Sequence, residues 1–90
     1  MVKTILKYTD GREKEIDCIF AAPTSNGARF SMCYKGGNTF ADTVVEMSGI
    51  AAFNCYDILA EKGTVCEGPW RLDALYHSDD GYGVIFVKEG

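Results

Sequence analysis

Two short turn motifs constrain the fold more than any other feature: TDG at residues 9–11 and DDG at residues 79–81, each lying between alternating apolar and polar residues. The closing glycine suits a three-residue hairpin loop, because glycine readily adopts the left-handed backbone conformation that such a loop requires. Antiparallel hairpins are therefore predicted at both ends of the chain. The likeness of the motifs indicates shared turn chemistry, not an internal repeat.

The opening run VKTILKYTDGREKEIDCIF also predicts a register. A three-residue loop places Lys7 opposite Glu13 and Lys3 opposite Asp17, whereas a two-residue loop would place Lys7 opposite Lys14. Unlike charges stabilise a cross-strand pair and like charges destabilise it, so the longer loop is favoured. The chosen register separates an apolar face from a charged face; the apolar face contains Val2, Leu6, Tyr8, Ile16, Cys18 and Phe20, and the charged face Lys3, Lys7, Glu13, Glu15 and Asp17.

Residues 21–27 form a loop by composition, and the run ARFSMCYK after them predicts a third strand. Its residues alternate, with Phe30, Met32 and Tyr34 on one face and Arg29, Ser31, Cys33 and Lys35 on the other.

Residues 39–48 are ambiguous. Thr39 followed by Asp42 is typical of a helix start, whereas the β-branched run at residues 43–45 favours a strand. We predict a strand and keep a helix as the alternative.

The run from about Ile50 to Lys62 predicts the main helix, ended by Gly63. At 100° per residue, Asn54, Asp57 and Glu61 fall on one polar stripe. The following run TVCEGPW is predicted to be a connector or short edge strand, since Gly68 and Pro69 do not suit a central strand.

The runs RLDALYH and YGVIFVKE predict a closing hairpin. With a three-residue loop, Tyr76 lies opposite Val84, Leu75 opposite Ile85, and Ala74 opposite Phe86. Both faces of this hairpin are then largely apolar, and a single helix covers only one of them. We expect the other face to be covered by a partner or by a second copy, in a homodimer through residues 71–88.

These elements together predict an α+β fold, an antiparallel sheet of about five or six strands with one main helix packed on one face. The 90 residues form a single compact domain over residues 1–90, and 47% hydrophobic residues suffice for its core. The helical alternative at residues 39–48 gives two helices and a smaller sheet.

The formal net charge of −4 is distributed unevenly. Residues 1–35 contain six Lys and Arg against four Asp and Glu, whereas residues 36–90 contain three against nine. Acidic surface repels phosphate backbones, so we expect no direct nucleic-acid binding and favour a protein partner with a basic surface. Apolar runs are too short to span a bilayer and the N-terminal residues are charged, so we predict a cytoplasmic protein without membrane contact.

The residues that usually carry chemistry form no recognisable motif. Cys18, Cys33, Cys55 and Cys66 include no C-x-x-C pair, so we expect free thiols, no metal and no cofactor. His77 is the only histidine, and nothing places a cysteine beside it. We therefore predict a protein that is not an enzyme.

The leading functional prediction is docking on a protein partner through acidic and aromatic surface. Trp70 and Tyr82 are the predicted anchors, because tryptophan and tyrosine are frequent anchors of protein interfaces; the alternative for Trp70 is a position in the core. Acidic side chains supply the predicted electrostatic contacts: Asp57, Glu61, Glu67, Asp79 and Asp80, together with Asp42 and Glu46. In size and charge, though in no motif, the chain is similar to the short acidic inhibitors that mobile genetic elements use against host defence systems, such as anti-CRISPR proteins. The similarity implies docking in a basic nucleic-acid cleft.

The alternative prediction is an oligomeric protein that binds a nucleotide or another small anion. Paired glycines can present backbone amides to an anion. The residues predicted for this site are Lys35, Gly36, Gly37, Asn38 and Thr39, with Arg71 from a neighbouring strand.

Overall fold

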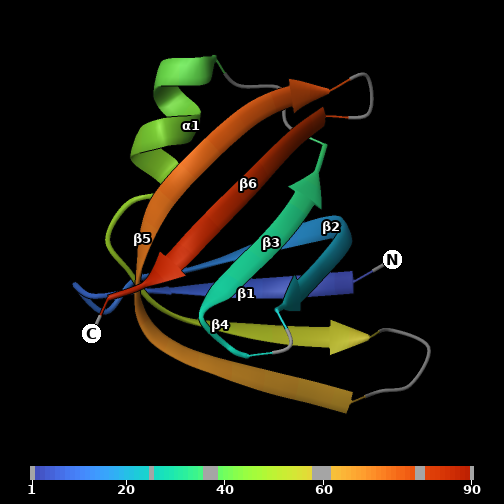
Figure 1. The fold of residues 1–90 in the computed structure, drawn as a ribbon, viewed down its shortest axis with the longest axis vertical. Helices are drawn as coiled ribbons and strands as arrows, with labels where there is room; N and C mark the ends of the chain where they lie inside the picture. The colour runs from blue at the N-terminus through green and yellow to red at the C-terminus, as the bar shows by residue number, and fades with distance from the viewer. Residues whose placement is uncertain (1, 25, 36–38, 58–61, 79–80, 90) are drawn as a thin grey trace.

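The fold is a closed six-stranded barrel (Figure 1). The computed structural model describes residues 2–24, 26–35, 39–57, 62–78 and 81–89. The strands are β1 (Val2–Tyr8), β2 (Glu13–Pro23), β3 (Arg29–Tyr34), β4 (Ile50–Asp57), β5 (Lys62–Ser78) and β6 (Gly81–Lys88), and helix α1 (Phe40–Glu46) connects β3 to β4. Neighbouring strands are antiparallel and follow the order β1–β2–β3–β6–β5–β4 around the barrel. The predicted α+β sheet with one main helix is therefore wrong.

Two long strands bend and are shared between the two halves of the barrel. Strand β2 pairs with β1 up to Cys18 and with β3 from Cys18 onward. Strand β5 pairs with β4 up to Trp70 and with β6 from Trp70 onward. We call β1, β4 and the first parts of β2 and β5 the first half-barrel, and β3, β6 and the second parts the second half-barrel. Bulges let a strand turn such a corner.

The bend in β5 explains why a Gly-Pro pair lies inside a long strand. Two residues, Gly68 and the cis-bonded Pro69, oppose only Ala51, because Ile50 pairs with Trp70 and Ala52 with Glu67. Proline has no N–H to give to a strand ladder, and this bulge is a position that requires none. The predicted connector or edge strand over residues 64–70 is therefore wrong.

The segment predicted as the main helix is strand β4. Its buried residues are Ile50, Ala52, Phe53 and Cys55. This pattern departs from strict alternation because the register with β5 shifts between Ile50 and Ala52. The bulge thus gave the sequence a helical spacing, and the last residues of the predicted helix, 58–61, lie outside the described part of the chain.

Residues 40–46 form helix α1, so the predicted strand is wrong and the helical alternative is right about this segment. Thr39 caps the helix, since its hydroxyl accepts a hydrogen bond from the Asp42 N–H at 3.1 Å. Thr43 and Met47, four residues apart, are both buried. One buried face at helical spacing outweighs the strand preference of the β-branched residues.

The first hairpin has the predicted register, with Lys7 opposite Glu13 and Lys3 opposite Asp17. Gly11 has the expected positive φ, 93°. Phe20 departs from the prediction: it is about half exposed, because the bulge after Cys18 turns it outward. The third strand is confirmed, with Phe30, Met32 and Tyr34 buried.

The closing hairpin exists, but its predicted register is wrong by one residue. Leu75 pairs with Val84, Tyr76 with Gly83, and Ser78 with Gly81. The last of these pairs leaves two residues, 79 and 80, in the connection instead of three.

Aromatic residues from both half-barrels fill the interior. The Phe30 and Phe53 rings stack with centroids 4.1 Å apart, and Phe86 lies 4.8 Å from Phe53. Trp70 lies 5.7 Å from Phe53 at the β5 bend, and its indole N–H donates to the Cys66 carbonyl at 3.0 Å. This cluster joins the two halves.

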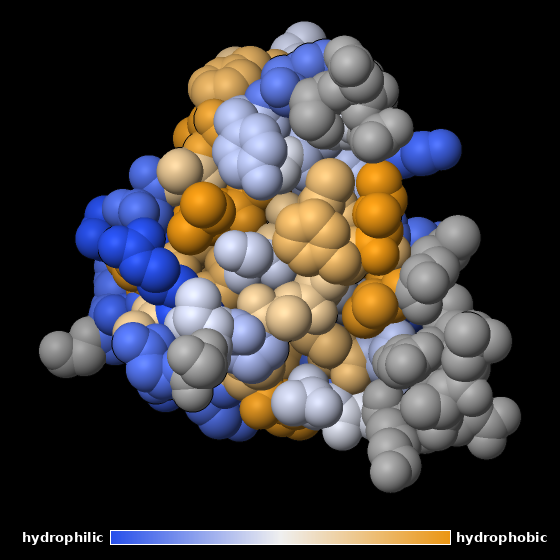
Figure 2. All heavy atoms as spheres, turned by 45° about the vertical axis from the view of Figure 1, so that its right-hand side comes forward, coloured by the Kyte–Doolittle hydropathy of each residue, from blue (hydrophilic) through white to orange (hydrophobic). Residues whose placement is uncertain are grey.

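The two half-barrels differ in their outward side chains. In the first, charged residues lie on the outside of β1 and β2, with one more on β5: Lys3, Lys7, Glu13, Glu15, Asp17 and Glu67. The second presents a largely uncharged middle (Figure 2). The helix among the described residues, α1, has seven residues and is too short to cross a bilayer.

Phe53→Ala tests the aromatic core. We expect the free energy of unfolding to fall by about 3 to 5 kcal/mol, because the change leaves a cavity where a fully buried ring stacked on Phe30. Urea denaturation measures this loss. The matched control is Val65→Ala on the outside of β5, expected to cost less than about 1 kcal/mol. Similar losses for the two variants would contradict this core.

Candidate functional site

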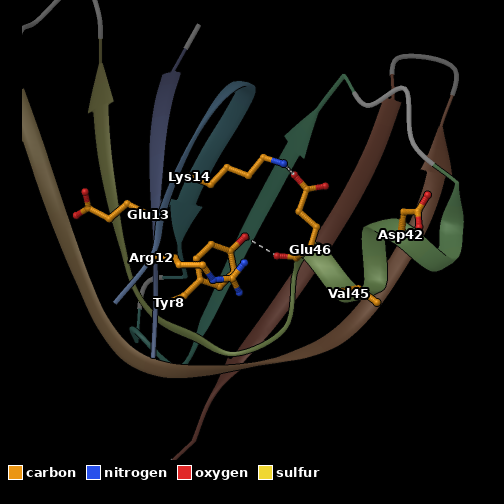
Figure 3. Close-up of a pocket in the computed structure, with 7 residues that line it drawn as sticks. All are labelled: Tyr8, Arg12, Glu13, Lys14, Asp42, Val45 and Glu46. Atoms are coloured by element: carbon orange, nitrogen blue, oxygen red, sulfur yellow. Dashed lines mark hydrogen bonds and ion pairs between the residues drawn. The ribbon is translucent and has the colours of Figure 1, made fainter. Parts of the chain in front are cut away.

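A groove lies between the β1–β2 hairpin and helix α1 (Figure 3). Its volume is about 510 Å³. Figure 3 shows Tyr8 and Lys14 reaching from the hairpin to Glu46 at the end of α1, with Asp42 and Val45 farther along the helix. The lining residues are Tyr8, Arg12, Glu13, Lys14, Asp42, Val45 and Glu46.

Two contacts fasten the end of α1 to the hairpin. The Tyr8 hydroxyl donates to the backbone carbonyl of Glu46 at 2.6 Å. The Glu46 carboxylate forms an ion pair with the Lys14 ammonium, and the Glu46 side chain is only 11% exposed. A charge-assisted contact at a poorly hydrated carboxylate is stronger than one between exposed side chains. The helix is thereby held in a fixed position.

The cations of this groove are already engaged. Arg12 pairs with Asp10 at 2.7 Å, and its guanidinium lies 4.8 Å from the centroid of the Tyr8 ring. Lys14 pairs with Glu46. The exposed carboxylates of Glu13 and Asp42, by contrast, form no ion pair with any described residue. Figure 3 shows the Glu13 side chain directed away from α1, so Asp42 is the described carboxylate beside the helix that has no ion pair.

Helix α1 turns apolar side chains to the outside. Phe40 is 54% exposed and Val45 73%. Val44 lines a second groove of about 360 Å³ on the side of α1 toward β5, with Pro69 and Arg71 opposite. We call Phe40, Asp42, Val44 and Val45 the α1 surface.

Tyr34 lies under the helix with its ring packed in the core. Its hydroxyl is buried and forms no hydrogen bond with the described residues. Burial, with a smaller contribution from the Glu46 carboxylate, raises the pKa of Tyr34 to about 12. The hydroxyl is therefore neutral through the physiological range.

The predicted aromatic anchors are core residues. Trp70 is 3% exposed and Tyr82 6% exposed, so neither presents a surface for docking in this structure. Glu67 is exposed on β5 but lines neither groove. The side chain of Asp57 and residues Glu61, Asp79 and Asp80 lie outside what the structure describes.

The predicted anion site is not assembled within the described residues. Lys35 is exposed, and Gly36, Gly37 and Asn38 fall outside the described ranges. Thr39 uses its hydroxyl to cap α1, and Arg71 lies in the second groove.

The thiols are poorly suited to nucleophilic chemistry. Burial raises the pKa of both Cys18 and Cys55 to about 11, so both are protonated near neutral pH. Cys33 and Cys66 are partly exposed, and all four cysteines are free. His77 is exposed and packs edge-on against Tyr82 at 5.2 Å. Within the described ranges, no three His, Cys, Asp or Glu side chains are grouped as metal ligands.

Comparison with protein-family models, curated proteins and solved structures finds no match for this chain. The site must therefore be interpreted from its own geometry.

Of the α1 surface, the sequence prediction included the acidic Asp42 but none of the apolar residues. Asp42 and Glu46 were predicted contacts, whereas Phe40, Val44 and Val45 were assigned to a strand. The signal that identifies them is the Thr39 cap followed by two buried residues, Thr43 and Met47, at a spacing of four.

Tyr34→Phe tests the buried hydroxyl. Because the folded-state pKa of about 12 exceeds the ordinary value of 10.0, the unfolded chain deprotonates first. The neutral Tyr34 hydroxyl therefore stabilises the folded state relative to the ionised form, and this stabilisation is complete below pH 10 and is lost as pH rises toward 12. We expect urea denaturation to show a shallower decline above pH 10 for the variant than for the wild type.

At pH 7 the free energy of unfolding of the Tyr34→Phe variant should lie within about 1 kcal/mol of the wild-type value, or above it, because the change removes a buried hydroxyl that has no hydrogen bond with the described residues. Tyr76→Phe, which removes an exposed tyrosine hydroxyl, is the control for the change in stability at pH 7. A loss of more than about 2 kcal/mol at pH 7 would show that the Tyr34 hydroxyl has a strong partner.

Proposed function

We propose that this chain is a non-enzymatic binding protein that docks on a protein partner through the α1 surface. The observation that carries the proposal is the exposure of Val45 and Phe40 on a helix that the barrel holds in place. Apolar side chains on a short, fixed helix contribute to the core of a protein interface with little loss of conformational entropy.

The charges of the α1 surface favour a partner with basic side chains. Asp42 is exposed and forms no ion pair with a described residue, while Arg12 and Lys14 are engaged by Asp10 and Glu46. An arginine or lysine from a partner would meet a carboxylate without displacing an existing ion pair. Such complementarity raises the association rate and selects the partner.

A basic nucleic-acid cleft is the partner surface that we propose. The Asp42 carboxylate on the α1 surface would take the place of a phosphate, and Phe40 and Val45 would contact the apolar parts of the cleft. On this proposal, the protein is an inhibitor of a host defence system and is encoded by a mobile genetic element. The acidic and apolar composition of the α1 surface supports this proposal.

A paired capture experiment tests the docking surface. The wild type, Asp42→Lys and the double variant Phe40→Ser with Val45→Ser are used to capture proteins from host lysate at low and high salt. A captured protein supports the proposal only if both α1 variants lose it and if salt weakens its binding. With that protein purified, we expect each variant to raise the Kd about tenfold or more.

Matched controls lie on the outside of β5. Val65→Ser removes an equally exposed apolar side chain, and Glu67→Lys reverses a charge outside the α1 surface. Both should retain the partner. If the α1 variants bind the partner as well as these controls do, the proposed surface is wrong. A competition assay with the purified partner then tests inhibition: if the wild type binds the partner but does not displace nucleic acid from it, the proposed inhibitor function is wrong.

A further inference from the structure

The outer face of the second half-barrel carries a continuous uncharged area across four strands. In one row, Phe20 pairs with Cys33, Cys33 with Gly83, and Gly83 with Tyr76. In the next row, Ala22 pairs with Ser31, Ser31 with Ile85, and Ile85 with Ala74. Paired residues project from the same face of a sheet, and the buried residues of β3 and β6 alternate with these. We call these two rows the apolar face.

Most of the apolar face is exposed or partly exposed, and Gly83 is buried with the Tyr76 ring against it. Figure 2 shows apolar side chains in the middle of this face and strongly hydrophilic ones at its left border. Phe20 and Tyr76, at opposite ends of one row, are both about half exposed, and so is the neighbouring Ile19. Single exposed apolar residues are ordinary, but a contiguous area spanning several strands marks an interaction surface.

The β1–β2 side of the first half-barrel provides an internal comparison. Its outer face carries charges of both signs, including the Lys3–Glu15 ion pair at 2.8 Å. Antiparallel sheets that face water usually carry such polar residues on that side. Exposure by itself therefore does not explain the uncharged middle of the second half-barrel.

The border of the apolar face is cationic within the described residues. At one end Val87 pairs with both Arg29 and Arg71. At the other end the exposed Lys35 lies beside Gly81. The described carboxylate at this border, Asp73, is paired with Arg29 at 3.0 Å, so Arg71 and Lys35 form no ion pair with a described residue.

We propose that the apolar face is a second docking surface, distinct from the α1 surface, and that it takes a protein surface that is apolar in the middle and bordered by carboxylates. Arg71 and Lys35 would pair with those carboxylates, and the rows between them would exclude water. A second copy of this chain would bring an identical cationic border, so charge complementarity favours a different, acidic partner. The chain would then join a basic protein to an acidic one. The homodimer predicted through residues 71–88 is an outcome that the test separates from this proposal.

The experiment selects phage-displayed random short peptides on the wild-type protein. Enriched peptides should combine apolar residues with Asp or Glu. Titration of one such synthetic peptide into isotopically labelled protein should shift the amide signals of Ser31, Cys33 and Ile85. We expect Phe20→Asp to raise its Kd at least about tenfold and Arg71→Glu by several-fold.

Controls for charge and for location are available on the same chain. Lys7→Glu and Val65→Asp change the outer face of the first half-barrel and should leave the Kd within about twofold. Asp42→Lys should also leave it unchanged, so failure of this proposal is distinguishable from failure of the α1 surface.

A matched pair of dyes provides a second measurement. Anilinonaphthalene sulfonate is an apolar anion, and phenylnaphthylamine is the same ring system without the sulfonate. The anionic dye should bind the apolar face more tightly than the neutral dye. The Arg71→Glu change should weaken binding of the anionic dye and leave binding of the neutral dye unchanged.

Three results would overturn the proposal. Enrichment of basic peptides, or of none, would contradict the acidic partner. Peptide or dye signals confined to the first half-barrel or to α1 would contradict the location. A wild type that is dimeric by light scattering and becomes monomeric on Phe20→Asp would show that a second copy covers this face.

Discussion

The bend of β5 at Trp70 is the constraint on which the rest of the structure depends. A six-stranded sheet closes here because β5 leaves β4 and joins β6 at that residue, while β2 makes the corresponding turn after Cys18. The Trp70 ring fills the corner and contacts Phe30 and Phe53, which belong to opposite halves. The bend that closes the barrel therefore also brings together the aromatic rings of the core. Without the bend, the two half-barrels would face apart and the aromatic cluster would be exposed.

Closure also determines what α1 can be. The chain must pass from β3 to β4, which are not neighbours in the barrel, and α1 lies within this connection. A helix of seven residues has too few turns to bury a broad face, and only Thr43 is buried within it, with Met47 just beyond. The remaining side chains must face outward. The contacts of Tyr8 and Lys14 with Glu46 fix the helix, so its exposed residues form a defined surface.

The sequence was sufficient where local rules and the tertiary structure agree. The TDG loop and the charges of Lys3 and Lys7 determined the first hairpin, and alternation alone identified β3. Prediction failed at bulges, because an extra residue breaks the period of two by which strands are recognised. The bulge near Ile50 made β4 look helical, and the bulge after Cys18 turned Phe20 from the core to the surface. Trp70 was misplaced for the same reason, since a corner that buries it is set by pairing with two different strands.

The candidate surfaces show why net charge predicts partner chemistry poorly in a small protein. Residues 36–90 are strongly acidic in sequence, yet Arg71 from that region borders the apolar face, while Glu46 is neutralised by Lys14 from the other region. Ion pairs such as Arg29–Asp73 and Arg12–Asp10 remove charges of both signs from what a partner meets. Among the described residues, the barrel order leaves the Asp42 carboxylate beside α1, and Arg71 and Lys35 beside the apolar face, without an ion pair. On the two proposals made above, the partner of each surface would be selected by these few unpaired charges and not by the total of −4.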